Sequence, residues 1–340
     1  MKITVAVLCL FALFSCQSNL SQETKEKIKE KESFWKARSE AINNSKTDLE
    51  YPIKKDTTIT EQRRYQLYLT SMDCSFEIFI DDVFLTKFIE NGTTKRGGYT
   101  GNIDLNHLLL TSGTHEIKVL MYPKYGKKIF DTKGILNIKL YYYLKNNFKE
   151  NFYTTQLNAN NGIELSQSSE QWMDKWDQQS QVGYDGSYVS KKPSQLKGLA
   201  VYEWRTTFEA DVPFNFASWL NSVNLEKEKV TDKKDIRKEV VAEYVKIHKI
   251  LSNKSSDEYL SIVGERENIF KSCLFYDKNE KTLQRIEFDE LMKNDDYVLE
   301  PLYEETFQLE FQSYGKLVNI FNKADGESIA DAMIGKIYLS

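Results

Sequence analysis

Apolar residues that recur at every second position, between residues 64 and 142, restrict the fold of this chain more than any other feature. Alternation of this kind places the apolar side chains on one face of a strand, whereas a helix requires spacings of three and four. The runs are Tyr65, Leu67 and Leu69; Phe76, Ile78 and Ile80; Ile117, Val119 and Met121; and Leu136, Ile138, Leu140 and Tyr142. They predict half-buried antiparallel strands.

Turn residues separate these runs. Asn91-Gly92 and Ser112-Gly113 are pairs that favour tight turns. Two later segments, residues 151–165 and 200–210, also have the character of extended chain. The spacing therefore predicts an antiparallel β-sandwich that ends near Phe214.

The order of strands and glycine turns after Phe76 is informative as well. Phe76-Glu77-Ile78-Phe79-Ile80-Asp81-Asp82 precedes Gly97-Gly98-Tyr99, and Leu110-Thr111-Ser112-Gly113 then leads into the run that ends at Val119. This order resembles the jelly-roll of galactose-binding-like domains. The resemblance implies a jelly-roll-like sandwich. Asp81-Asp82 stands where that family usually has Asn-Gly, and no sugar-contacting residue carries over.

The period changes to that of helices after Val230. An apolar stripe from Ile236 to Leu251 predicts a first helix, with Asp232 or Asp235 at its N-cap. Ser255-Ser256-Asp257-Glu258 has the pattern of a capping box and predicts the start of a second helix, which ends near Asp277. A third, shorter helix is expected from Leu283 to Met292.

Strands are expected again near the C-terminus. They are predicted at 307–311 and 317–321, with a turn at 313–316 and a closing strand within 334–339. The fold class is therefore α+β and multidomain: a jelly-roll-like sandwich followed by a smaller helical domain. The order of elements in that second domain is compatible with an NTF2-like cone.

The first residues of the chain predict export. Lys2 precedes a short apolar run, Ile3 to Phe14, which is too short to span a bilayer and is typical of a secretory signal. Leu13-Phe14-Ser15-Cys16 resembles the lipobox of bacterial lipoproteins. That resemblance implies cleavage before Cys16 and attachment of fatty acyl chains such as palmitate, which hold the protein on a membrane. Cleavage of a plain secreted protein near the same site is the alternative.

The sequence divides into residues 1–16 (signal), 17–56 (charged tether), 57–214 (sandwich) and 215–340 (α+β domain). The tether alternates Glu and Lys, and Phe34 and Trp35 are its candidates for docking on the body. The residues after Cys16 lack the acidic run of some surface-exposed lipoproteins. We therefore expect a lipid-anchored envelope protein that faces the periplasm rather than the cell surface.

Charge and cysteine content exclude several classes. The net charge is −4, and the basic residues are scattered, so no nucleic-acid footprint exists and membrane attachment depends on Cys16. Cys74 and Cys273 are the cysteines outside the signal region. Export permits a disulfide between them, but they are expected in different domains, so two separate buried thiols are the preferred prediction.

No catalytic or metal-binding constellation stands out. His107, His115 and His248 are the three histidines; no zinc spacing is present, although His107 and His115 flank a turn where they could meet. The sequence lacks GxSxG, P-loop and GxGxxG motifs, and its SxxK matches are scattered. Acidic pairs such as Asp81-Asp82 and Asp295-Asp296 are interpreted as solvated turns. No catalytic residue, metal or cofactor is therefore assigned, and an enzyme is disfavoured.

One polar segment, residues 171–194, is rich in aromatic side chains. These are Trp172, Trp176, Tyr184 and Tyr188. Aromatic residues in a polar loop can form a stacking surface for sugars or a protein-binding hot spot, and they can equally fold back as a satellite hydrophobic cluster. They are the candidate ligand-binding residues.

The preferred functional prediction is a non-catalytic, membrane-anchored envelope lipoprotein that acts as a protein-interaction module, with toxin immunity as one example. A glycan-binding module that uses the aromatic segment is the first alternative. An NTF2-like pocket enzyme in the C-terminal domain is the second.

Overall fold

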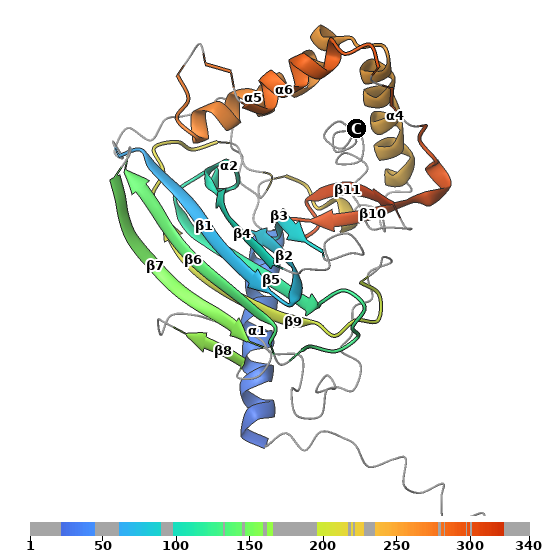
Figure 1. Cartoon of the computed structure of the whole chain (residues 1–340). Helices are drawn as coiled ribbons and strands as arrows, with labels where there is room; N and C mark the ends of the chain where they lie inside the picture. Colours follow the sequence, from blue (N-terminus) through green and yellow to red (C-terminus); the bar gives the residue numbers. More distant parts are fainter. Residues whose placement is uncertain are drawn as a thin grey trace, which may run out of the picture.

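The chain is a mixed α+β protein in which two antiparallel sheets precede a set of helices and a β-hairpin (Figure 1). The computed structural model describes residues 22–44, 61–89, 98–131, 133–144, 147–158, 162–165, 196–216, 219, 222–227, 235–277, 280–281, 283–296, 298–299 and 301–322. Among these residues the predicted strands and helices are all present, with one error at a helix cap.

The first sheet has five strands in the order β4-β1-β6-β7-β8. They are β4 (Gly98–Asp104), β1 (Arg63–Met72), β6 (Ile135–Leu144), β7 (Asn147–Asn158) and β8 (Gly162–Leu165). The second sheet has four strands in the order β3-β2-β5-β9. They are β3 (Val83–Phe88), β2 (Cys74–Ile80), β5 (Gly113–Pro123) and β9 (Tyr202–Ala210). All pairings are antiparallel, as the alternation predicts.

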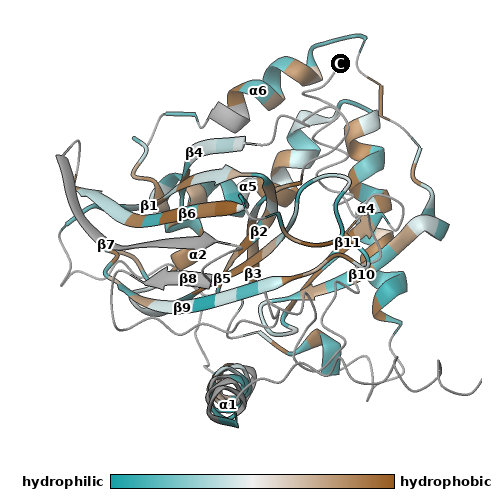
Figure 2. Ribbon diagram, turned by 60° about the horizontal axis from the view of Figure 1, so that its bottom comes forward, coloured by the Kyte–Doolittle hydropathy of each residue, from teal (hydrophilic) through white to brown (hydrophobic). Residues whose placement is uncertain are grey.

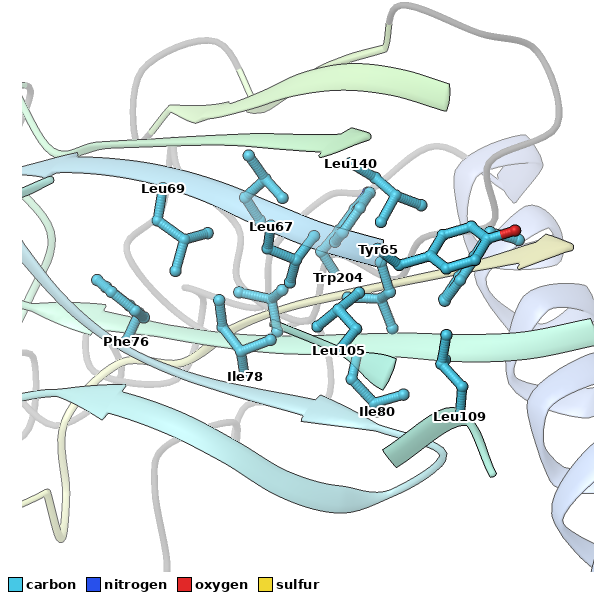
Figure 3. Close-up of a cluster of buried hydrophobic side chains, with 14 of the residues drawn as sticks. Tyr65, Leu67, Leu69, Phe76, Ile78, Ile80, Leu105, Leu109, Leu140 and Trp204 are labelled. Atoms are coloured by element: carbon cyan, nitrogen blue, oxygen red, sulfur yellow. The ribbon is translucent and has the colours of Figure 1, made fainter. Parts of the chain in front are cut away.

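The apolar residues of the alternating runs form a single core between the two sheets. The labelled side chains that converge there are Tyr65, Leu67, Leu69, Phe76, Ile78, Ile80, Leu105, Leu109, Leu140 and Trp204 (Figure 3). Leu67 pairs with Leu140 across the first sheet, and Trp204 pairs with Val119 across the second. Truncation of such buried side chains to Ala typically costs about 2–5 kcal/mol.

The two sheets differ on their outer faces. Strand β1 alternates between buried and half-buried positions, and strand β6 does so over most of its length, so the described part of the chain leaves one face of the first sheet partly exposed. Every residue of β2 is buried, and β5 is buried at most positions on both faces. The outer face of the second sheet is therefore covered by other parts of the chain.

Helix α1 (Gln22–Asn44) provides part of that cover. It lies beside β9, and its N-terminal half extends away from the body (Figures 1 and 2). Trp35 is only 2% exposed, which confirms that it docks, whereas Phe34 is 45% exposed and does not. Trp35, Arg38 and Ile42 share one helix face because of their spacing. The buried Lys316 ammonium donates to the Ile42 carbonyl oxygen at 3.0 Å, near the end of the helix where carbonyls lack helical partners.

Three helices and a hairpin make up the described C-terminal part. They are α4 (Ile236–Ser252), α5 (Ser256–Cys273), α6 (Leu283–Met292), the 3-10 turn η2 (Glu304–Thr306), β10 (Phe307–Gln312) and β11 (Leu317–Asn322). Asp235 caps α4 by accepting from the Lys238 N–H, as predicted. The predicted capping box at Ser255 is wrong. The Ser255 N–H, which Glu258 would have to accept from, already donates to the Ile250 carbonyl oxygen at 3.1 Å, and the Ser255 side chain makes no cap bond.

The C-terminal helices share contacts with the sheets. Cys273, the last residue of α5, belongs to the core between the sheets. Asn106 begins the short helix α2 (Asn106–Leu109) and donates through Nδ2 to the Cys273 carbonyl oxygen at 3.0 Å. Cys74 and Cys273 are both buried and are not joined by a disulfide, which confirms the prediction of two separate buried thiols. The division at residue 214 stays a prediction, and the closing strand within 334–339 lies outside the described residues.

Candidate functional site

One face of the five-stranded sheet carries the polar and aromatic residues that alternate with the buried apolar ones. We call it the polar aromatic face. Its members are Arg64, Gln66, Tyr68 and Thr70 of β1, Thr100, Asn102 and Asp104 of β4, and Asn137, Lys139, Tyr141 and Tyr143 of β6. The strand register brings them together. Tyr68 lies between Asn102 and Lys139, and Gln66 lies between Asp104 and Tyr141.

A hydrogen-bond network orders this face. Arg64 binds both carboxylate oxygens of Asp104, through Nε at 2.7 Å and Nη2 at 2.6 Å. Gln66 donates through Nε2 to Asp104 Oδ1 at 2.7 Å. The Tyr141 hydroxyl oxygen lies 3.0 Å from Gln66 Oε1 and 2.7 Å from Asn102 Oδ1, so its single hydrogen can be donated to either oxygen. Four side chains from three strands are thus fixed around the Gln66 amide.

The electrostatics keep these groups in one protonation state. Burial of Asp104 opposes ionisation, but the hydrogen bonds from Arg64 and Gln66 outweigh it, so the pKa of the carboxyl is lowered. Burial, together with the neighbouring Tyr143, raises the pKa of the Tyr141 hydroxyl to about 12. The network is therefore unchanged across the neutral pH range.

Aromatic rings lie beside the polar network. The rings of Tyr141 and Tyr143 meet edge to face with their centroids 5.4 Å apart, an arrangement that aromatic pairs prefer. The Lys139 ammonium lies 5.9 Å from the centroid of the half-buried Tyr68 ring. Aromatic rings next to ordered amides and ions form a surface that can stack on a flat ligand and hydrogen-bond to its edge.

A second cluster of charged residues lies on the covered side of the other sheet. Asp81, at the β2–β3 turn, is 3% exposed, and its Oδ2 lies 2.6 Å from His115 Nδ1. Glu116 is 1% exposed and lies 3.5 Å from Arg38 Nε of α1 and 3.5 Å from Arg205 Nη1 of β9. Asp81 was expected in a solvated turn. That expectation is wrong, because α1 covers the turn and Arg38 pairs with it at 3.9 Å.

Both ring nitrogens of His115 are engaged. Nε2 lies 2.9 Å from the Thr111 carbonyl oxygen, which can only accept, so Nε2 donates. Nδ1 lies 2.6 Å from Asp81 Oδ2. Burial raises the pKa of Glu116, although Arg205 and the Tyr314 hydroxyl partly offset this effect.

The same cluster joins distant parts of the chain. Asp82 accepts from Lys118 and, through Oδ2, from the Tyr314 N–H at 3.0 Å. The Tyr314 hydroxyl donates to Glu116 Oε2 at 2.8 Å. Because Asp81, His115 and Glu116 are almost fully enclosed, this cluster holds α1 and the β10–β11 turn against β5 and presents no surface for a substrate.

The predicted site residues are distributed differently from the expectation. Cys16, Trp172, Trp176, Tyr184 and Tyr188 lie outside the described residues. His115 pairs with Asp81, while His107 packs on Phe270 of α5 with ring centroids 5.0 Å apart. In the part of the chain that the structure describes, no group of His, Cys, Asp or Glu side chains could hold a metal ion.

The polar aromatic face was missed from the sequence, although its signal is present. Its residues are the even-numbered positions of β1 and β4 and the odd-numbered positions of β6, between the apolar ones. The sequence shows this signal in Arg64, Gln66 and Tyr68, which occupy successive outward positions of one strand.

Comparisons with known proteins add no relative. No protein-family model, no curated protein and no solved structure matches this chain. Among the described helices, none combines the length and the apolar character needed to cross a membrane.

Proposed function

We propose that this protein is a membrane-anchored envelope lipoprotein that binds a saccharide on the polar aromatic face. The observation that carries the proposal is the ordered group of Gln66, Asn102, Tyr141 and the Arg64–Asp104 pair beside Tyr68, on a sheet face that the described part of the chain leaves partly exposed. This proposal replaces the protein-interaction module as the preferred function. It also moves the glycan site from the aromatic segment, residues 171–194, to the five-stranded sheet.

The chemistry of the face matches that of a sugar chain. Pyranose rings present C–H groups on their flat sides, which pack on aromatic rings such as Tyr68 and Tyr143, and hydroxyls around their edges. Preformed networks bind such hydroxyls at low entropic cost because their own side chains are already ordered. Outward residues recur about every 7 Å along a strand, so β1, β4 and β6 offer a strip long enough for several sugar units.

The N-terminal region supports presentation from a membrane. Lipidation at Cys16 would place the anchor just before α1. The helical segment from Gln22 to Phe34, which precedes the docked face, adds about 20 Å of rise. Because Trp35 and Arg38 dock on the body, α1 acts as a stiff spacer rather than a loose tether. The anchor, the periplasmic orientation and the jelly-roll-like class of the sandwich belong to this proposal.

The proposed function does not include an NTF2-like fold for the C-terminal part. Within the described residues 235–322, a two-stranded sheet accompanies α4, α5 and α6. An NTF2-like cone needs a larger curved sheet, so that part of the fold stays a prediction.

A glycan panel tests the proposed function. We expect the full mature chain, solubilised in detergent, to bind at least one polysaccharide class, and Tyr68→Ala to weaken that binding about tenfold, because one aromatic stacking contact is lost. Tyr303→Ala is the matched control, since Tyr303 is 56% exposed and lies off this face. No binding to the panel, or equal loss in both variants, would contradict the proposal.

A protein partner is the second candidate, favoured by a separate observation. Several apolar side chains of the C-terminal part are exposed, among them Val298 at 82% and Ile286 at 42%. Exposed apolar side chains mark a protein contact where they form a contiguous patch. A pull-down from envelope extract would return one stoichiometric protein if this candidate is correct, and Val298→Ser with Ile286→Ser would then abolish capture.

A further inference from the structure

The hydrogen bonds within the polar aromatic face engage its carboxylate and two of its amide oxygens. Both oxygens of Asp104 are engaged by Arg64, and one of them also by Gln66. The amide oxygens of Gln66 and Asn102 both lie within hydrogen-bonding distance of the Tyr141 hydroxyl, which has a single hydrogen to donate. Since the Gln66 amide nitrogen donates to a carboxylate, which only accepts, the orientation of that amide is fixed.

Several hydrogen-bond donors of the face, in contrast, have no partner among the described residues. Lys139 is exposed, carries three N–H groups, and forms no ion pair with any residue that the structure describes. Asn102 is exposed, and its amide nitrogen has no partner among the described residues. Arg64 is 42% exposed and keeps an Nη1 group beyond the two bonds to Asp104.

The charges of the described residues on this face also favour a ligand that accepts hydrogen bonds and carries negative charge. Arg64 and Asp104 neutralise each other as a two-bond pair. No described residue pairs with the positive charge of Lys139, which lies directly across from Tyr68 on β6 with its ammonium 5.9 Å from the centroid of the Tyr68 ring. A sugar that stacks on Tyr68 would therefore meet an ammonium group at its edge.

We infer that the saccharide bound by this face is acidic, with a uronate carboxylate that pairs with Lys139. The inference rests on the proposed function. A carboxylate supplies only acceptors and a negative charge, which complements the donors and the positive charge described above. The neighbouring Asn102 amide and Arg64 guanidinium would receive ring hydroxyl or carboxylate oxygens of adjacent sugar units.

The test compares two polymers that differ only in the charged group. Polygalacturonate and the same polymer after reduction of its carboxylates to alcohols are titrated against the full mature chain in detergent. We expect at least a fivefold preference for the acidic form, which falls as salt is raised. Lys139→Gln should remove this preference. Lys127→Gln, an equal charge change in the exposed β5–β6 loop, should leave it intact.

The outcomes separate the two proposals. Equal binding of both polymers, with loss in Tyr68→Ala, would overturn the acidic ligand and keep saccharide binding. A preference that persists in Lys139→Gln would overturn the role of that lysine. If neither polymer binds, nor any other uronate polymer such as alginate, the acidic ligand is refuted, and neutral members of the glycan panel then decide the proposed function.

Discussion

Asn106 offers the most direct test of how the helical part is joined to the sheets. Its side chain is 0% exposed and makes three hydrogen bonds. Oδ1 accepts from the Tyr65 N–H at 2.7 Å, and Nδ2 donates to the carbonyl oxygens of Arg63 at 2.8 Å and Cys273 at 3.0 Å. Asn106→Leu keeps the approximate volume and removes all three bonds. The substitution leaves one N–H and two carbonyl oxygens without their partner, at about 1–3 kcal/mol for each such group, so the free energy of unfolding should fall by at least about 3 kcal/mol.

The assay is urea unfolding combined with hydrogen exchange. Because Asn106 binds both β1 and the end of α5, we expect amides near Tyr65 and near Cys273 to lose protection together. Asn137→Leu is the control, since Asn137 is half-buried on the polar aromatic face and has no side-chain bond among the described residues; its effect should stay within about 0.5 kcal/mol. A loss below about 1 kcal/mol, or unchanged protection of α5, would refute the coupling.

Further predictions concern pH, α1 and the anchor. Burial lowers the pKa of His107 to about 4, partly offset by Asp104, so below pH 6.5 the unfolded chain binds a proton that the folded chain rejects. Stability should fall by about 3 kcal/mol between pH 6.5 and 4, and His107→Phe, which keeps the packing on Phe270, should remove that fall in urea titrations at several pH values. Trp35→Ala should loosen α1, so that hydrogen exchange accelerates in α1 and, because Arg38 is then drawn away from the buried Asp81 and Glu116, also in the neighbouring part of β5; unchanged exchange in α1 would contradict docking through Trp35. Cys16→Ala should move the protein from the membrane to the soluble fraction, and a variant that sediments with membranes would contradict lipidation.

Local patterns predicted the elements well because each depends on neighbouring residues. The alternation at Tyr65, Leu67 and Leu69 gave a strand with those residues buried, and the stripe from Ile236 to Leu251 gave α4. The capping box failed because the Ser255 N–H is engaged by the preceding helix, which the four-residue motif does not encode.

The candidate site was harder to predict because exposure depends on contacts between distant segments. The outward residues Glu203 and Arg205 of β9 and Arg64 and Gln66 of β1 follow the same alternating pattern. In the structure Arg205 lies under the Trp35 ring and beside Glu116, while Arg64 is 42% exposed. No local signal distinguishes these two strands.

What separates the two sheets is the desolvation of charge. Glu116 and Asp81 are enclosed, and their burial is tolerable only because Arg38, Arg205 and His115 supply opposite charge or hydrogen bonds at short range. Those partners come from α1, β9 and β5, so the covered face requires the N-terminal helix and cannot be opened to a ligand without stranding buried charges. The polar aromatic face carries no such constraint, since Arg64 and Asp104 satisfy each other within the sheet. A ligand can therefore bind there without first displacing any described part of the chain, which is why the five-stranded sheet, and not the charged cluster, is the place to look for function.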